Sequence, residues 1–129
     1  MKYAVRIKTD NTVDLIEVPD RHEWTWYPEQ LGCSFFEIVH PKGLDEPYLM
    51  IVDEEGALNL ERRINFFASW LYRTQDHKCP IYGDALIMME DGEDIIGLDL
   101  DDAEDIREQI ESHMHEAFDA VWEAVAQIC

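Results

Sequence analysis

The sequence predicts an α+β domain: a mostly antiparallel sheet built from hairpins, two short helices, and a long C-terminal helix packed on one face of the sheet. Two observations lead to this fold class. Short runs of strand-favouring residues separated by turn residues fill most of the chain, and one apolar stripe at helical spacing fills its end. The 129 residues, 47% of them hydrophobic, are enough for one core. A single domain is therefore expected over residues 1–129.

Four strands are predicted in the first half of the chain. Apolar and charged side chains alternate after the first methionine, and the pair Asp10-Asn11 favours a turn before a returning run. The predicted strands cover residues 2–8, 13–18, 34–40 and 48–52. Between the second and third of these strands, Pro28 and Gly32 are typical of the start and the end of a short helix.

A second short helix and a further hairpin are predicted after the fourth strand. Residues 62–72 have helical spacing, and Asn65 can cap the helix because its short side chain accepts bonds from free N–H groups. The pair Asp91-Gly92 is a strong hairpin signal between strands predicted over 85–90 and 94–98.

One long helix is expected from about Asp102 to Ile128. Asp101 and Glu104 resemble a capping box at its start, where acidic residues also suit the helix dipole. The apolar stripe that should pack on the sheet consists of Ile106, Ile110, Met114, Ala117, Val121 and Val125.

Three further apolar residues, Phe118, Trp122 and Ile128, widen the surface of this helix beyond one stripe. An unmatched apolar strip tends to find a partner, so a homodimer is predicted. The alternative is that the N-terminal hairpin, or the aromatic residues Trp24 and Trp26, cover the strip within the same chain.

Charge is the main functional signal in the sequence. Ten Lys and Arg stand against 29 Asp and Glu, which gives a net charge of -19. Residues 79–129 hold 15 of the acids and a single base, Arg107. Such a chain is poorly suited to bind nucleic acid or an anionic membrane directly, because both attract cations. A solvated surface that keeps the protein soluble is the competing explanation.

Targeting signals and cysteine usage both favour a cytoplasmic protein. No apolar run approaches the roughly 20 residues of a membrane span, and the start of the chain lacks the apolar core of a signal peptide. The three cysteines, Cys33, Cys79 and Cys129, are widely spaced and odd in number. This pattern suits free thiols in a reducing compartment.

Four short stretches carry a resemblance to a known family. They are LGCSFFE (31–37), YLMIVDEEG (48–56), NFFASWLY (65–72) and IYGDALI (81–87). In this order they resemble an uncharacterised family of small acidic domains carried by bacteriophages and mobile elements of Gram-positive bacteria. The resemblance covers roughly residues 30–100. This chain departs from it at Cys33, where the family tends to have a second glycine, and in its acidic C-terminal helix. The resemblance implies an accessory protein acting inside a bacterium, and it assigns no active-site residue.

The sequence contains no legible catalytic or metal-binding set, so no enzymatic activity, metal or cofactor is predicted. A Gly-rich phosphate loop, a nucleophile elbow and a zinc-protease motif are all missing. The acidic run over 91–105 does not fit a calcium loop, because the position that requires glycine is acidic. His77 and Cys79 lack the second pair that zinc requires. Asp84 is more consistent with a turn than with a general base.

The sequence therefore favours an inhibitor of anti-CRISPR or anti-restriction type, in which carboxylates occupy a basic surface that a host defence protein uses for nucleic acid. A CRISPR effector is the most plausible partner. The expected partner-binding residues are Glu90, Asp91, Glu93, Asp94, Asp101, Asp102, Glu104, Asp105 and Glu108. Asp99 is left out because it can cap the helix. The alternatives are a plain protein-interaction domain and a module that sequesters a nucleotide signal through Arg62, Arg63 and Arg73.

Overall fold

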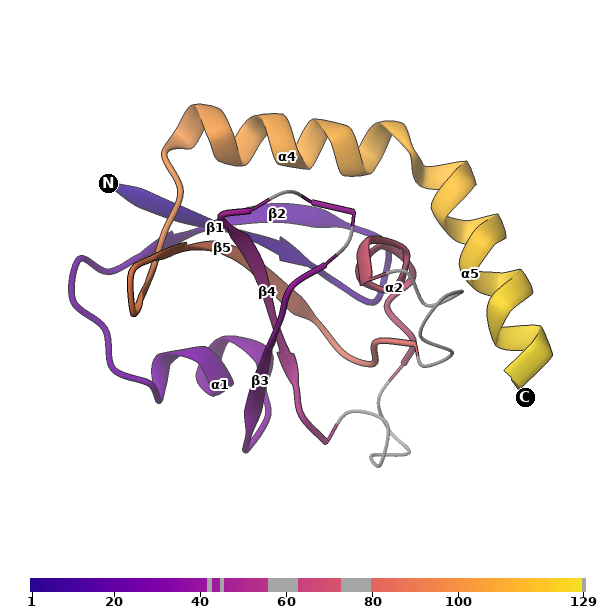
Figure 1. Ribbon diagram of the computed structural model, residues 1–129, viewed down its shortest axis with the longest axis horizontal. Helices are drawn as coiled ribbons and strands as arrows, with labels where there is room; N and C mark the ends of the chain where they lie inside the picture. Colours follow the sequence, from indigo (N-terminus) through magenta and orange to yellow (C-terminus); the bar gives the residue numbers. More distant parts are fainter. Residues whose placement is uncertain (42, 45, 56–62, 73–79, 129) are drawn as a thin grey trace.

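The computed structural model describes residues 1–41, 43–44, 46–55, 63–72 and 80–128, and it has the predicted α+β fold. The described residues form one antiparallel six-stranded sheet and four helices. In chain order the elements are β1 (Lys2–Ile7), β2 (Val13–Val18), α1 (Trp26–Leu31), β3 (Phe36–Val39), β4 (Tyr48–Asp53), α2 (Phe66–Tyr72), β5 (Ala85–Asp91), β6 (Asp94–Ile96), α4 (Leu100–Ser112) and α5 (Met114–Ile128). Figure 1 shows α4 lying across one face of the sheet and α1 on the opposite face.

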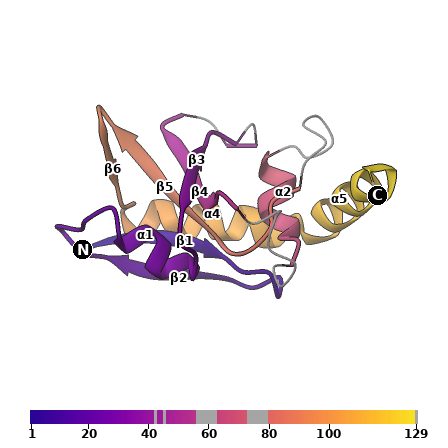
Figure 2. The ribbon, with the colours of Figure 1, turned by 90° about the horizontal axis from the view of Figure 1, so that it is seen from below.

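The strand order is β2-β1-β5-β4-β3, and β6 is attached to β5 outside this path. Strand β1 pairs with β5 only from Val5 to Ile7, and beyond that point β6 takes its place beside residues 89–91. The start of β1 is tied instead to the segment after β6, where Tyr3 and Leu98 exchange two backbone hydrogen bonds of 2.8 and 2.7 Å. The sheet consequently opens at this end, as Figure 2 shows between β6 and the N-terminus.

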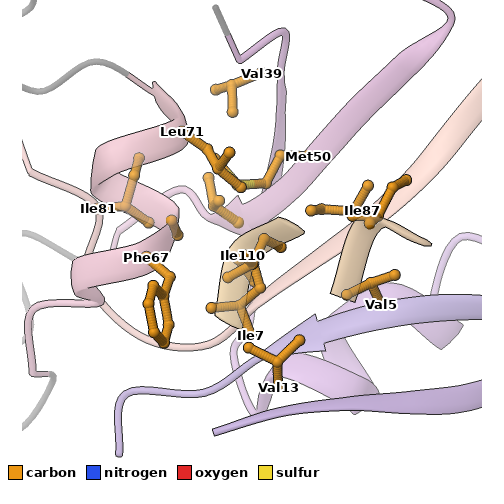
Figure 3. Close-up of a cluster of buried hydrophobic side chains, with 14 of the residues drawn as sticks. Val5, Ile7, Val13, Val39, Met50, Phe67, Leu71, Ile81, Ile87 and Ile110 are labelled. Atoms are coloured by element: carbon orange, nitrogen blue, oxygen red, sulfur yellow. The ribbon is translucent and has the colours of Figure 1, made fainter. Parts of the chain in front are cut away.

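Alternation along the strands sends apolar side chains into a core on each face of the sheet. On the face covered by α4 and α2, Val5, Ile7 and Ile87 pack with Phe67 and Ile110 (Figure 3). The core on the face covered by α1 contains Ala4, Val18, Tyr27, Leu31, Leu49, Ile51, Leu86 and Met88. Both faces of the central strands are therefore buried, and the sheet needs helices on each side.

The boundaries of the short elements differ from the sequence-based expectation by a few residues. Pro28 is the third residue of α1 rather than the first, whereas Gly32 ends the helix as expected with a positive φ of 63°. Strand β3 begins at Phe36, two residues later than predicted. Helix α2 begins at Phe66, directly after its predicted cap.

The predicted single C-terminal helix is wrong, because the chain forms two helices that meet at His113. Its φ and ψ of −107° and 21° are not helical. Ser112 Oγ donates to the Gln109 carbonyl at 3.0 Å, and His113 Nδ1 lies 2.7 Å from the same oxygen. Side chains that bond a backbone carbonyl in this way compete with the helical ladder. Helix α5 then turns away from α4 and extends past the end of the sheet (Figures 1 and 2).

The apolar stripe continues through this break, which explains why its periodicity resembles one helix. Ile106 and Ile110 of α4 are buried against the sheet, and Ala117 and Val121 of α5 are fully buried where α5 packs on α2. The side chains of Met114 and Val125, predicted for the same stripe, lie outside the described part of the structure.

The predicted capping box of Asp101 and Glu104 is also wrong, because α4 begins earlier, at Leu100. Asp99 occupies the N-cap position with an extended backbone, but its side chain makes no capping bond. The Asp99 carboxylate instead accepts a 2.5 Å bond from the Lys2 ammonium, which lowers the pKa of Asp99. Attraction to a cation on β1 has replaced the local capping interaction.

Asn65 caps α2 as predicted and is completely buried. Its Oδ1 accepts a bond from the Ala68 amide at 3.0 Å. Its Nδ2 donates to the carbonyl of Ile7 at 2.9 Å and to that of Gly83 at 3.0 Å. One amide therefore joins the end of β1, the segment before β5 and the start of α2.

Replacing Ile110 by Ala is expected to lower the free energy of unfolding by about 2–5 kcal/mol, because the side chain is 1% exposed and its loss leaves a cavity between α4 and the sheet. Denaturant unfolding followed by circular dichroism measures the change. The exposed neighbour Glu108 is the control, and Glu108→Ala should stay within roughly 0.5 kcal/mol of the parent protein. Equal stability of the two variants would show that the stripe is not buried.

The Asn65→Asp variant is expected to be destabilised by about 3–5 kcal/mol, since it aims a buried carboxylate at two carbonyl oxygens. Lowering the pH should restore part of this loss, because protonation removes the charge. Asn11→Asp, in an exposed turn, changes the net charge equally and is the matched control. Unfolding curves that coincide for the two variants would contradict the joining role of Asn65.

Candidate functional site: an acidic hairpin and helix

The hairpin of β5 and β6 carries four of the nine predicted carboxylates. Asp91 pairs with Asp94 at its end, so the two turn residues are Gly92 and Glu93, one position later than the Asp91-Gly92 signal suggested. Gly92 has a φ of 64°, which supplies the positive first torsion of a two-residue hairpin turn. The side chains of Glu90, Asp91, Glu93 and Asp94 are all exposed.

Helix α4 carries the other five carboxylates. Ala103, Ile106 and Ile110 face the sheet and are buried, which fixes how the helix is rotated. This rotation leaves exposed the residues Asp101, Asp102, Glu104, Asp105 and Glu108. Only residues 97–99 separate β6 from α4, and they are held to β1 through Leu98 and Asp99. The hairpin and α4, which carry the two groups of acids, are therefore joined by a three-residue segment that is anchored to β1.

The nine carboxylates, which we call the acidic surface, remain largely unneutralised. Among the described residues, the one basic side chain within ion-pairing distance of them is His40, whose Nε2 lies 3.5 Å from Glu90 Oε2 and carries a charge only when protonated. Two of the carboxylates also act on a partly buried tyrosine. Burial raises the pKa of Tyr48, and the negative charges of Asp102 and Asp105 raise it further. Tyr48 pairs with Met89, three residues before Gly92, the first residue of the hairpin turn. Electrostatics thus connects the α4 carboxylates with the base of the hairpin.

A cleft of about 550 Å³, which is not predicted from the sequence, lies beside the hairpin. It lies between β6 and the segment that leads from the end of β2 into α1. Its lining residues are Lys2, Val18, Pro19, Asp20, Arg21, His22, Trp24, Tyr27, Glu93, Asp94, Ile95, Ile96 and Gly97. No motif in the sequence predicts this cleft. Its two walls come together only because β6 replaces β1 as the partner of β5 at this end of the sheet.

Two of the lining residues, His22 and Tyr27, contact each other. His22 Nε2 lies 2.6 Å from the Tyr27 hydroxyl, and His22 Nδ1 lies 3.2 Å from the Pro19 carbonyl oxygen. Because a carbonyl can only accept, Nδ1 carries the proton and Nε2 accepts from the hydroxyl. Burial, with a further contribution from the Asp94 carboxylate, raises the pKa of Tyr27 to about 12.

The aromatic residues near α1 do not cover the C-terminal helices, which corrects one alternative drawn from the sequence. Trp24 stacks on Phe36 with ring centroids 5.7 Å apart, and Trp26 contacts Tyr27, all on the α1 side of the sheet. Phe118 of α5 instead stacks on Phe66 of α2 and remains 44% exposed. The side chain of Ile128 lies outside the described residues.

Other residues singled out from the sequence do not form a second site. Arg63 is exposed, whereas Arg62, Arg73, His77 and Cys79 lie outside the described residues. Asp84 Oδ1 accepts a bond from the Thr9 amide at 3.1 Å, which is a structural role at a turn. Within the described ranges, no three His, Cys, Asp or Glu side chains are grouped to hold a metal ion. No described helix has the length and apolar character needed to cross a bilayer.

Comparison with known proteins identifies a family but no activity. The family model described as Domain of unknown function (DUF3846) matches residues 1–111, so the chain belongs to that family. No curated protein and no solved structure matches the chain. The matched range is longer than the roughly 30–100 covered by the sequence motifs. It takes in all but the last residue of α4, so of the two C-terminal helices only α5 lies beyond it.

The phenol of Tyr27 is expected to ionise at about pH 12, above the usual value near 10. A raised pKa means that the folded state favours the neutral phenol. This stabilising contribution is complete below about pH 10 and is lost as the pH rises through about 12. Phenolate absorbance during an alkaline titration measures it, and the Tyr27→Phe variant should lack the late phase. A Tyr27 that titrates like an exposed tyrosine would contradict this environment.

Proposed function

We propose that this member of the DUF3846 family is a non-catalytic protein that binds a basic, nucleic-acid-handling surface of a bacterial defence protein, with a CRISPR effector as the first candidate. The observation that carries the proposal is the acidic surface: nine exposed carboxylates on a tight hairpin and a packed helix, with His40 as the one described basic side chain within ion-pairing distance. Carboxylates on ordered backbone lose less freedom on binding and offer charge-assisted bonds to Arg and Lys.

The spacing of these carboxylates is compatible with a groove built for phosphates. Asp101, Asp105 and Glu108 follow one another at intervals of four and three residues, or about 6 and 4.5 Å along the helix axis. Phosphates on one DNA strand repeat about every 3.4 Å along the duplex. The carboxylates are therefore spaced between one and two phosphate repeats apart, so a groove that binds phosphates can meet the helix with more than one cation. A net charge of -19 also accelerates encounter with a basic target.

The proposed setting is the cytoplasm of a bacterium carrying a phage or mobile element, where such an inhibitor would meet its target. This setting follows from the motif resemblance and the cysteine usage. A homodimer formed through Phe118 and Trp122, which are 44% and 60% exposed on α5, remains part of the proposal. Its surface is separate from the acidic surface, so dimer formation would leave the carboxylates accessible.

Reversing four charges of the acidic surface is expected to abolish most of the binding. The variant carries Glu93, Asp94, Asp102 and Asp105 each replaced by Lys. The measurement is displacement of a DNA duplex from a purified CRISPR effector at low salt. We expect a loss of affinity of about tenfold or more, because four attractive contacts become repulsive.

The matched control reverses four exposed carboxylates elsewhere: Glu17, Glu29, Glu37 and Glu54. Both variants change the net charge equally, so a control that behaves like the parent protein assigns the effect to the acidic surface. Equal loss in both variants would mean that overall charge, not this surface, drives binding. An acidic-surface variant that folds and binds like the parent protein would overturn the proposed function.

A further inference from the structure

The cleft beside the hairpin has an acidic wall and a wall that carries aromatic residues. Glu93 and Asp94 line it from the hairpin. Trp24 and Tyr27, together with Asp20, line it from the segment that leads from β2 into α1. Its volume of about 550 Å³ lies within the usual range of ligand pockets and is large enough to hold one long side chain.

Two of the basic residues that line the cleft, Lys2 and His22, already have partners within the protein. The Lys2 ammonium is held by Asp99, a residue that is not part of the lining, at 2.5 Å. The two nitrogens of His22 are occupied by the Pro19 carbonyl and the Tyr27 hydroxyl. Arg21 is then the remaining cation, exposed and without an ion pair among the described residues. Three carboxylates, those of Asp20, Glu93 and Asp94, line the same cleft, so negative charge is in excess there.

Trp24 supplies a flat surface beside these carboxylates. Its ring stacks on Phe36 at an interplanar angle of 11°, and Tyr27 contacts it at a tilt. Even so, Trp24 is 60% exposed. One ring face is therefore supported from below while the other remains open. An open indole face beside carboxylates attracts cations, and a planar guanidinium can stack on it while bonding an acid.

We propose that this cleft binds the guanidinium group of an arginine side chain presented by the partner protein. The inference rests on the proposed function and identifies one specific contact within it. The guanidinium stacks on Trp24 and donates hydrogen bonds to Glu93 and Asp94. Arginine is preferred to lysine, because an ammonium group cannot combine planar stacking with a two-pronged bond.

The test uses N-acetyl-argininamide, which presents the side chain without backbone charges and requires no partner protein. Titration is followed through the NMR signal of the Trp24 indole N–H, which the Trp24→Leu variant identifies. We expect a saturable shift, with weaker shifts from the lysine analogue and none from the neutral citrulline analogue. Saturation with citrulline equal to that with arginine would overturn the proposal.

Two pairs of variants locate the site. Glu93→Gln with Asp94→Asn should weaken binding of N-acetyl-argininamide about threefold or more, whereas Glu104→Gln with Asp105→Asn, an equal charge change on α4, should not. Trp24→Leu should weaken binding similarly, whereas Trp122→Leu, at a tryptophan of equal 60% exposure, should not. In the tryptophan pair, the backbone amide signals of the hairpin report binding. Equal effects within either pair would overturn the assignment.

The same titration distinguishes an arginine site from an anion site in the cleft, and it tests the cleft independently of effector binding. A shift with adenosine monophosphate and none with N-acetyl-argininamide would overturn the proposal and show an anion site built around Arg21. Failure of the probe combined with loss of effector binding in an Asp102→Lys and Asp105→Lys variant would overturn the cleft contact alone. A positive probe titration with full effector binding in the four-lysine acidic-surface variant would instead contradict the proposed function.

Discussion

The buried amide of Asn65 is the interaction on which the arrangement of the elements depends. It forms hydrogen bonds with backbone groups in three places: the end of β1, the segment before β5 and the start of α2. These three points belong to segments far apart in the chain, and their polar groups are buried where water cannot reach them. A side chain with two donors and one acceptor in the right places removes that penalty. The position of α2 then sets that of α5, which packs on it.

A second constraint operates at the other end of the sheet. Strand β5 has to pair with β4 along one edge and with two different strands along the other. Because β6 takes over where β1 departs, the hairpin leans out from the body of the domain and its acids face solvent. The same exchange of partners separates the hairpin from the segment after β2 and creates the cleft. The charged feature and the hollow beside it thus have one structural origin.

Local signals in the sequence were sufficient for the features that depend on neighbouring residues. The cap at Asn65, the helix end at Gly32 and the strand over 13–18 all follow from short-range chemistry, and each is present in the structure. The nine carboxylates were predicted to be accessible because charge is rarely buried, and they are. Periodicity failed at His113, since an apolar stripe does not reveal where two side chains compete for one carbonyl.

The cleft and the true start of α4 could not be predicted, because both depend on partners distant in sequence. Asp99 gives up its capping role for Lys2, which is 97 residues away. Trp24 finds Phe36 rather than the C-terminal helices only because α1 and β3 meet on one face of the sheet. Residue types and their spacing along the chain do not predict such long-range contacts. They determine which groups can interact, and the topology determines which of them do.

The close contact at Gly97 has a consequence for how such a protein can change over time. A side chain there would place its first carbon 2.7 Å from Cβ of Lys2 and 3.2 Å from the backbone of Tyr3. A side chain at position 97 therefore requires β1 to shift, whereas the side chains of Glu93 and Asp94 at the tip of the hairpin are exposed. The tightly packed position and the exposed tip thus lie only a few residues apart, so changes at Glu93 or Asp94 need not disturb the contact between Gly97 and β1.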